Sequence, residues 1–107
     1  MDFHLTTRTQ QVSLVKGRLS VEHLSKKSEQ MPMYPTPIKD ITFITVVDKH
    51  RLFMQVHHRT DEQGKPLKSS KLRKYYFDAS PEELSRFLIA FGRYSNLSAS
   101  LGQSLYN

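Results

Sequence analysis

The side chains that could support catalysis in this chain are few and widely spaced. There is no cysteine, which excludes thiolate nucleophiles, disulfides and cysteine zinc sites. His57 and His58 are neighbours, so on a strand they point to opposite faces and cannot easily ligate one metal ion. Ser13 and Lys16 have the spacing of a Ser-Lys nucleophile motif, but nothing else in the sequence supports one. We therefore expect no catalytic residue, no metal site, no cofactor and no small-molecule substrate.

Basic side chains, by contrast, are concentrated in one part of the chain. The formal net charge is +6 at pH 7. Residues 49–77 hold eight Lys and Arg side chains against two acidic ones, so this segment accounts for the whole excess. A patch of this sign attracts a polyanion by electrostatic steering and by counterion release. The alternative is that these charges only keep a solvated surface soluble.

Aromatic rings are interleaved with these cations. If residues 52–59 and 73–77 are strands, alternation places Phe53 and Tyr76 on one face of the sheet, with lysines along its border. Rings on such a face can stack unpaired bases while the cations follow the phosphates, although an aromatic residue in a strand is more often part of a core. The expected nucleic-acid-binding residues are Phe53, His57, Arg59, Lys65, Lys68, Lys71, Lys74 and Tyr76.

Three strands and a helix must position these side chains. Residues 41–47 and 52–59 are rich in β-branched and aromatic residues, with a polar connection of hairpin length between them. Residues 61–71 contain Gly, Pro and Ser and predict a loop, after which a strand resumes at 73–77. On these strands Leu52, Met54, Val56, Tyr75 and Phe77 are expected to face the core.

A helix is expected to follow the last strand. Ser80 and Glu83 form a capping box around Pro81. An apolar stripe then continues at helical spacing through Leu84, Phe87, Leu88 and Phe91, and beyond Gly92 through Tyr94, Leu97, Leu101 and Leu105. Either the helix runs to about residue 104 or a second short helix follows. The long stripe predicts a homodimer through the C-terminal helix, the alternative being a tail folded on its own sheet.

The N-terminal part of the chain favours a β-hairpin. Two apolar runs flank Lys16 and Gly17, and Gly supplies the positive φ that a tight turn needs. A helix starting at Ser20 is the competing interpretation. Residues 25–40 contain three prolines and predict an extended connector.

Together these elements predict a single domain of the α+β class. Residues 1–24 form the hairpin region, 25–40 the Pro-rich connector and 41–107 a β-β-β-α core. The expected architecture is an antiparallel sheet of four to five strands with a C-terminal helix packed on one face. No apolar run suggests a signal peptide or a membrane span, so we expect a cytoplasmic protein, nuclear if the source is eukaryotic.

Residues 43–88 resemble the single-stranded-DNA-binding core of the positive cofactor four transcriptional coactivators, whose fold is related to the Whirly and Pur proteins. The resemblance lies in two apolar strands, the D-x-x-G-K connection at 61–65 and the polar-Pro-Glu step within 78–84. It implies that the sheet and its basic loops hold a single strand and that the helix pairs two subunits. By position it assigns the backbone contacts to Arg59, Lys65, Lys68, Lys71 and Lys74.

This chain also departs from that family. It has no tryptophan, and residues 1–40 fall outside the resemblance. The last strand and helix are similar as well to the small RNA-binding subunit pair of the signal recognition particle. We therefore expect binding of single-stranded DNA or RNA, in a transcriptional or replication accessory role. The alternative is a small regulatory adaptor that docks an acidic protein through the Pro-rich connector or the C-terminal leucines.

Overall fold

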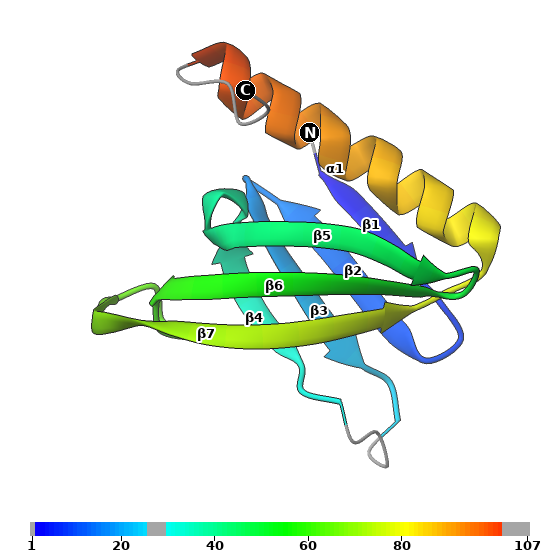
Figure 1. Cartoon of the computed structure of the whole chain (residues 1–107), viewed down its shortest axis with the longest axis horizontal. Coiled ribbons are helices and arrows are strands. Elements are labelled where there is room, and N and C mark those ends of the chain that lie inside the picture. The colour runs from blue at the N-terminus through cyan, green and yellow to red at the C-terminus, as the bar shows by residue number, and fades with distance from the viewer. Residues whose placement is uncertain (1, 26–29, 102–107) are drawn as a thin grey trace.

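Seven antiparallel strands in two sheets, followed by one helix, make up the described part of the chain (Figure 1). The structure is a computed structural model that describes residues 2–25 and 30–101, with side chains described as far as residue 95. The α+β class, with antiparallel strands and a C-terminal helix, is confirmed.

The N-terminal half forms a four-stranded sheet with strands in sequence order. Its members are β1 (Phe3–Thr6), β2 (Gln10–Val15), β3 (Arg18–His23) and β4 (Met33–Pro37). Lys16 and Gly17 have φ values of 52° and 76° and turn β2 into β3, because a two-residue hairpin turn of this hand needs positive φ at both positions. The predicted hairpin is confirmed, and the competing helix from Ser20 is wrong.

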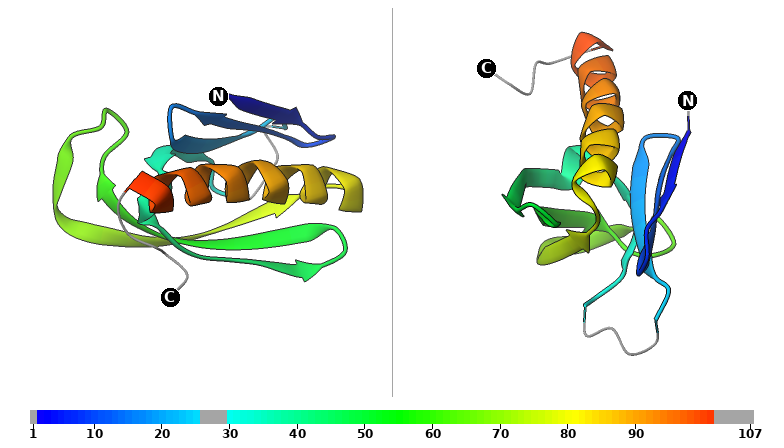
Figure 2. Two further views of the ribbon diagram at one scale, coloured as in Figure 1. Left: turned by 90° about the horizontal axis from the view of Figure 1, so that it is seen from above. Right: turned by 90° about the vertical axis from the view of Figure 1, so that its right-hand side faces the viewer.

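The second sheet has three strands and follows a short 3-10 helix, η1 (Ile38–Asp40). Its strands are β5 (Ile41–Asp48), β6 (Arg51–Thr60) and β7 (Pro66–Asp78), again in sequence order. Helix α1 (Pro81–Leu101) then begins after Asp78 and two further residues. In Figure 2, α1 lies along the opening between the two sheets.

The core lies between the sheets and under the helix. Its members come from the inner faces of both sheets and from one stripe of α1, and include Leu14, Leu19, Leu52, Phe77 and Phe87, each with no exposed surface. The predicted inward set is confirmed, since Leu52, Met54, Val56, Tyr75 and Phe77 are all buried. Burying such side chains stabilises the fold by about 1.5–3 kcal/mol each.

The capping box at the start of α1 is also confirmed. The backbone N–H of Glu83 donates to Ser80 Oγ at 3.2 Å, and the backbone N–H of Ser80 donates to Glu83 Oε1 at 2.9 Å. The helix continues past Gly92 to Leu101, so no second short helix begins within this range. The side chains of Leu97 and Leu101, and all of Leu105, lie outside what the structure describes.

Three details differ from expectation. Part of the 25–40 connector is β4, because Pro35 and Pro37 are tolerated on a strand at the edge of a sheet. The expected loop at 61–71 is only a turn at 61–65, and β7 begins at Pro66, so Lys68 and Lys71 lie on a strand. The N-terminal strands also form a sheet of their own, since β4 pairs with β3 and η1 separates it from β5, in place of one sheet of four to five strands.

Candidate nucleic-acid interface

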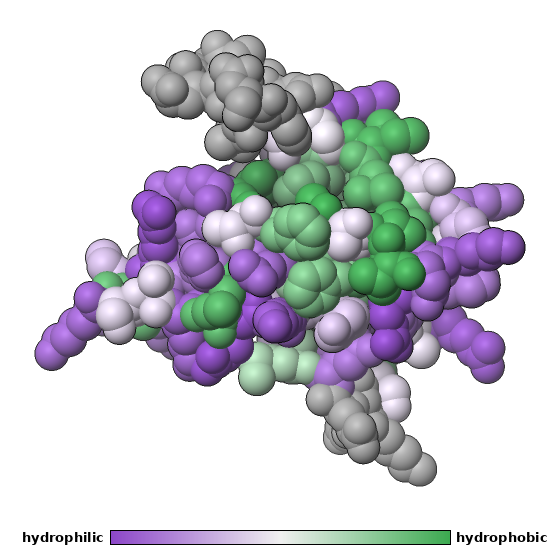
Figure 3. Space-filling model, viewed as in Figure 1, coloured by the Kyte–Doolittle hydropathy of each residue, from purple (hydrophilic) through white to green (hydrophobic). Residues whose placement is uncertain are grey.

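Three aromatic rings lie together on the outer face of the second sheet. Phe53 of β6 is directly opposite Tyr76 of β7, with ring centroids 5.3 Å apart, and Phe43 of β5 lies 6.2 Å from Phe53. Phe43 is 52% exposed and Tyr76 is 40% exposed. Phe43, Phe53 and Tyr76, here called the aromatic cluster, therefore present ring surface to solvent. Figure 3 shows apolar side chains gathered on this side of the molecule.

Strand alternation explains why these rings face outward. Leu52 and Met54, on either side of Phe53, are buried, and so are Tyr75 and Phe77 on either side of Tyr76. Since neighbouring residues of a strand point to opposite faces, Phe53 and Tyr76 must lie away from the core. The expectation that these two rings share an outward face is confirmed by the register.

A guanidinium group borders the aromatic cluster. The Arg51 Cζ atom lies 5.3 Å from the centroid of the Tyr76 ring, a cation–π distance. Arg51 is held there by Asp78, whose Oδ1 accepts from Nε at 2.6 Å and whose Oδ2 accepts from the terminal nitrogen at 3.2 Å. This hydrogen bonding raises the pKa of Arg51 and, with that from Gln30, lowers the pKa of Asp78. Arg51 is therefore a cation that Asp78 holds beside the Tyr76 ring.

Two further predicted residues share this outer face. Lys74 is the register partner of Gln55, and His57 is the partner of Leu72, so both follow the alternation set by Phe53 and Tyr76. Lys74 is exposed, and His57 is half-buried. The structure therefore brings four predicted residues to one face: Phe53, His57, Lys74 and Tyr76.

The other predicted cations lie elsewhere. Lys71 is the register partner of the buried His58, which places it on the opposite side of β7 from Lys74. Lys65 is in the 61–65 turn beyond Thr60, and β6 rises by roughly 23 Å between Phe53 and that end. Lys68 lies between Pro66 and Lys71, where the register of β6 and β7 shifts.

Arg59 lies near the buried Asp40 of η1. Its backbone N–H donates to Asp40 Oδ2 at 3.2 Å, and its Nε lies 4.0 Å from Asp40 Oδ1. Asp40 is 2% exposed, so the arginine side chain balances a carboxylate that water does not reach. The Arg59 side chain nevertheless remains 73% exposed, so its guanidinium is still accessible to a phosphate.

Two residues of this surface, Phe43 and Arg51, are not among the residues that the sequence predicts to bind nucleic acid. The outward direction of Phe43 depends on a register shift between Ile41 and Phe43, which the residue pattern of β5 does not reveal. The sequence pattern places Arg51 in the polar connection before the strand at 52–59, whereas in the structure Arg51 is the first residue of β6. Because Arg51 is two residues before Phe53, extending the strand by one residue at its start places Arg51 on the same face as Phe53.

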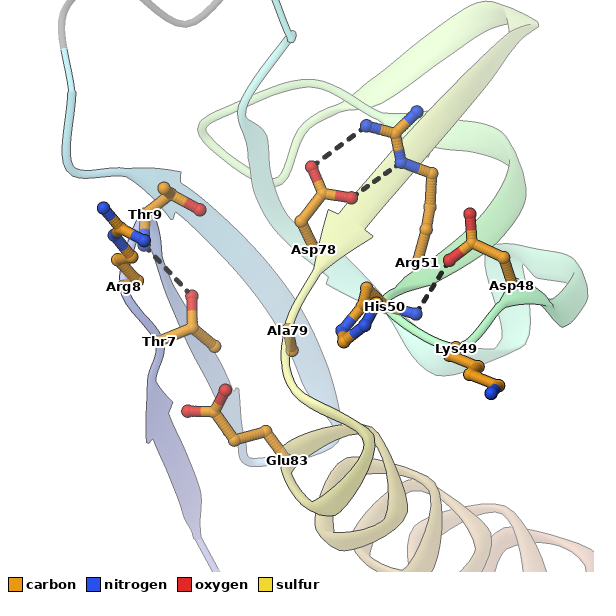
Figure 4. A pocket seen from close by; sticks show the side chains of 10 residues that line it. All are labelled: Thr7, Arg8, Thr9, Asp48, Lys49, His50, Arg51, Asp78, Ala79 and Glu83. Atoms are coloured by element: carbon orange, nitrogen blue, oxygen red, sulfur yellow. Dashed lines mark hydrogen bonds and ion pairs between the residues drawn. The ribbon is translucent and has the colours of Figure 1, made fainter.

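A separate cleft of about 810 Å3 opens between the β1–β2 turn, the β5–β6 turn and the start of α1 (Figure 4). Its basic and acidic side chains are equal in number: Arg8, Lys49 and Arg51 against Asp48, Asp78 and Glu83. Asp78 binds Arg51, Asp48 accepts from the His50 backbone, and Glu83 caps α1. The cleft therefore has no excess charge that would select an anion or a cation.

Neither a metal centre nor a membrane-spanning helix is found in the part of the chain that the structure describes. Over residues 2–25 and 30–101, no three His, Asp or Glu side chains gather closely enough to hold a metal ion. Among the same residues, no helix combines the length and the apolar character needed to cross a lipid bilayer.

Three comparisons with known proteins find no match for this chain. No protein-family model matches it, and the searches of curated proteins and of solved structures likewise return no match. The resemblance of residues 43–88 to the positive cofactor four coactivators therefore stays a prediction.

Proposed function

We propose that this chain is a non-enzymatic nucleic-acid-binding protein that holds single-stranded DNA or RNA on the outer face of β5, β6 and β7. The observation that carries the proposal is the aromatic cluster, whose rings are exposed on a sheet face beside Arg51 and Lys74. It acts inside the cell as an accessory factor of transcription or replication, as the resemblance at residues 43–88 implies.

The chemistry of the face favours unpaired bases over a duplex. A base stacks on an exposed ring only when its own face is free, and each such contact contributes about 1–3 kcal/mol. Phe43, Phe53 and Tyr76 lie in a row across three neighbouring strands, so successive bases can occupy successive rings. Arg51 and Lys74 stand at the border, where the phosphates of such a strand would pass.

The experiment is a fluorescence anisotropy titration with labelled single-stranded and duplex DNA and RNA at two salt concentrations. We expect binding to single strands, weaker binding to duplex, and affinity that falls with salt because counterions are released. Substituting Tyr76 by leucine should weaken single-strand binding, whereas Leu72→Ala, on the same strand, should not. Undetectable or salt-insensitive binding to every oligonucleotide would remove the proposal.

A second candidate is an adaptor for an acidic protein partner, docking through Lys65 and Lys68 rather than through the Pro-rich connector or the C-terminal leucines that the sequence suggests, and one observation favours it. Lys65 and Lys68 are exposed at the far end of the β6–β7 hairpin, remote from the aromatic cluster, where a carboxylate-rich partner needs no rings. Pull-down from a lysate with the Lys65→Gln/Lys68→Gln variant and with Tyr76→Leu separates the two. An adaptor loses its partner only in the lysine variant, and single-strand binding suffers mainly in the tyrosine variant.

A further inference from the structure

Arg51 keeps hydrogen-bond donors available after its ion pair with Asp78 is made. Asp78 accepts from Nε and from one terminal nitrogen of the guanidinium. Arg51 makes no other hydrogen bond with the part of the chain that the structure describes, so the second terminal nitrogen keeps both of its N–H groups. Figure 4 shows this nitrogen pointing away from Asp78. Because the Arg51 side chain is 43% exposed, a ligand can reach these donors.

Asp78 is itself restrained by residues outside its own sheet. Its backbone N–H donates to Oε1 of the buried Gln10 at 2.7 Å, and Gln30 Nε2 donates to Asp78 Oδ2 at 3.1 Å. Gln10 Nε2 also donates to the backbone oxygen of Tyr76 at 3.3 Å. These contacts restrain Asp78, and through it Arg51, before any ligand arrives. Donors that are restrained in advance lose less conformational entropy on binding.

The available donors lie beside the rings on which bases are proposed to stack. Arg51 and Phe53 are two residues apart on β6 and share a face, and Phe53 is directly opposite Tyr76 on β7. The Arg51 Cζ atom lies over the Tyr76 ring, 5.3 Å from its centroid, and the Phe53 centroid is also 5.3 Å from that of Tyr76. A base stacked on Phe53 would therefore have an edge next to the guanidinium.

The ion pair with Asp78 determines which kind of acceptor suits these donors. The carboxylate balances the positive charge of Arg51, and a phosphate at the guanidinium would come close to that carboxylate, which is a like charge. Lys74 makes no ion pair with any residue that the structure describes. Of the two cations at the border of the aromatic cluster, Lys74 is therefore better suited to phosphates. Arg51 is better suited to a neutral group with two adjacent acceptors.

We propose that Arg51 recognises guanine in a single strand bound on the outer face of β5, β6 and β7. Guanine presents O6 and N7 side by side, and the fork of a guanidinium donates to both. Adenine carries an amino group where guanine has O6, so it offers no such pair. Cytosine has adjacent acceptors at N3 and O2, but the larger purine covers more of the Phe53 ring. This inference rests on the proposed function and adds a base preference to it.

The test is an anisotropy titration of the full chain with a short oligothymidylate in which one central base is varied. Guanine should bind about fivefold or more tightly than adenine, the lower limit for a bidentate arginine contact. Hypoxanthine keeps O6 and N7 and should bind as guanine does. The analogue 7-deazaguanine lacks N7 and should lose most of the preference. Cytosine should bind more weakly than guanine.

Three variants assign the preference to Arg51. Arg51→Lys keeps the charge but lacks the fork, so the guanine-to-adenine ratio of affinities should fall to about twofold or less. Asp78→Asn should also lower this ratio, because it removes the carboxylate that positions Arg51, whereas a merely structural role would lower stability and leave the ratio unchanged. Lys74→Gln is the matched control: it removes another cation of the outer face and should weaken every oligonucleotide while the ratio stays at the wild-type value.

Four outcomes would overturn the inference and leave the proposed function intact: equal affinity for guanine and adenine, a preference for cytosine, hypoxanthine that binds like adenine, or a guanine preference that Arg51→Lys retains. Absence of binding to every oligonucleotide would instead remove the proposed function, and the inference with it. The modified bases are tested on the wild-type chain, so they decide the inference even if Arg51→Lys fails to fold by circular dichroism.

Discussion

Replacing His58 with glutamine is expected to remove part of the acid sensitivity of folding. His58 is 1% exposed, stacks on the ring of Tyr34 at 4.6 Å, and places Nε2 2.6 Å from the Tyr75 hydroxyl. Burial raises the pKa of Tyr75 to about 12, so this hydroxyl stays protonated and donates to the neutral imidazole. The Nδ1 atom lies 3.4 Å from Thr36 Oγ1, which completes the hydrogen bonding of a neutral ring.

The magnitude follows from proton linkage. Burial lowers the pKa of His58 below its ordinary 6.5; Arg73 and Lys71 add to this, while Asp40 opposes it. The unfolded chain therefore binds a proton at a higher pH than the folded chain. Above pH 6.5 both states are neutral at this site and stability is unaffected. As the pH decreases from 6.5 to the lowered pKa of His58 in the folded chain, the free energy of unfolding decreases by up to about 1.4 kcal/mol per pH unit.

Urea unfolding at pH 7.0 and at pH 5.5 measures this effect. The wild type should lose stability between these two values, and His58→Gln should lose less. His57→Gln is the matched control, because His57 is the neighbouring residue on the outer face and should retain the wild-type pH dependence. Equal pH dependence in the wild type and in His58→Gln would refute the reasoning.

Three other predictions follow from individual contacts. Lys74→Gln should reduce the slope of log affinity against log salt by about 0.7, as measured by anisotropy, whereas Lys71→Gln, on the opposite side of β7, should change it less. Gln10→Leu should destabilise folding by about 1–3 kcal/mol in denaturant unfolding, because the buried Gln10 Oε1 accepts from the Asp78 backbone N–H at 2.7 Å across the two sheets. Ser80→Ala should lower the free energy of unfolding by about 1 kcal/mol, since it removes half of the capping box.

Local features of the fold were predictable because local residues determine them. The Lys16–Gly17 turn needs only positive φ, and the start of α1 needs only Ser80, Pro81 and Glu83. The division into two sheets was not predictable, because it depends on which distant strands pair. Gln10 illustrates the difficulty: its amide joins β2 to the β7–α1 junction, and nothing in its sequence neighbourhood marks it as a buried contact.

The full extent of β4 and of β7 could not be predicted from the sequence, for opposite reasons. Pro35 and Pro37 read as signals that break a strand, yet an edge strand such as β4 tolerates them. The first half of β7 lacks an apolar alternation, because it extends beyond the core and pairs with β6 while exposed to solvent on both faces. At the candidate site, strand alternation alone predicts that Phe53 and Tyr76 face outward. The outward direction of Phe43 depends on a register shift that only the pairing of β5 with β6 reveals.

The most direct test of the single-strand-binding face is a nuclear magnetic resonance titration of the 15N-labelled chain with a short single-stranded oligonucleotide. Binding on the aromatic cluster predicts the largest amide shifts at residues such as Phe43, Phe53, Lys74 and Tyr76, with little change in β1 to β4. Shifts confined to β1 to β4 or to the cleft beside Arg8, or no shifts at all, would contradict it.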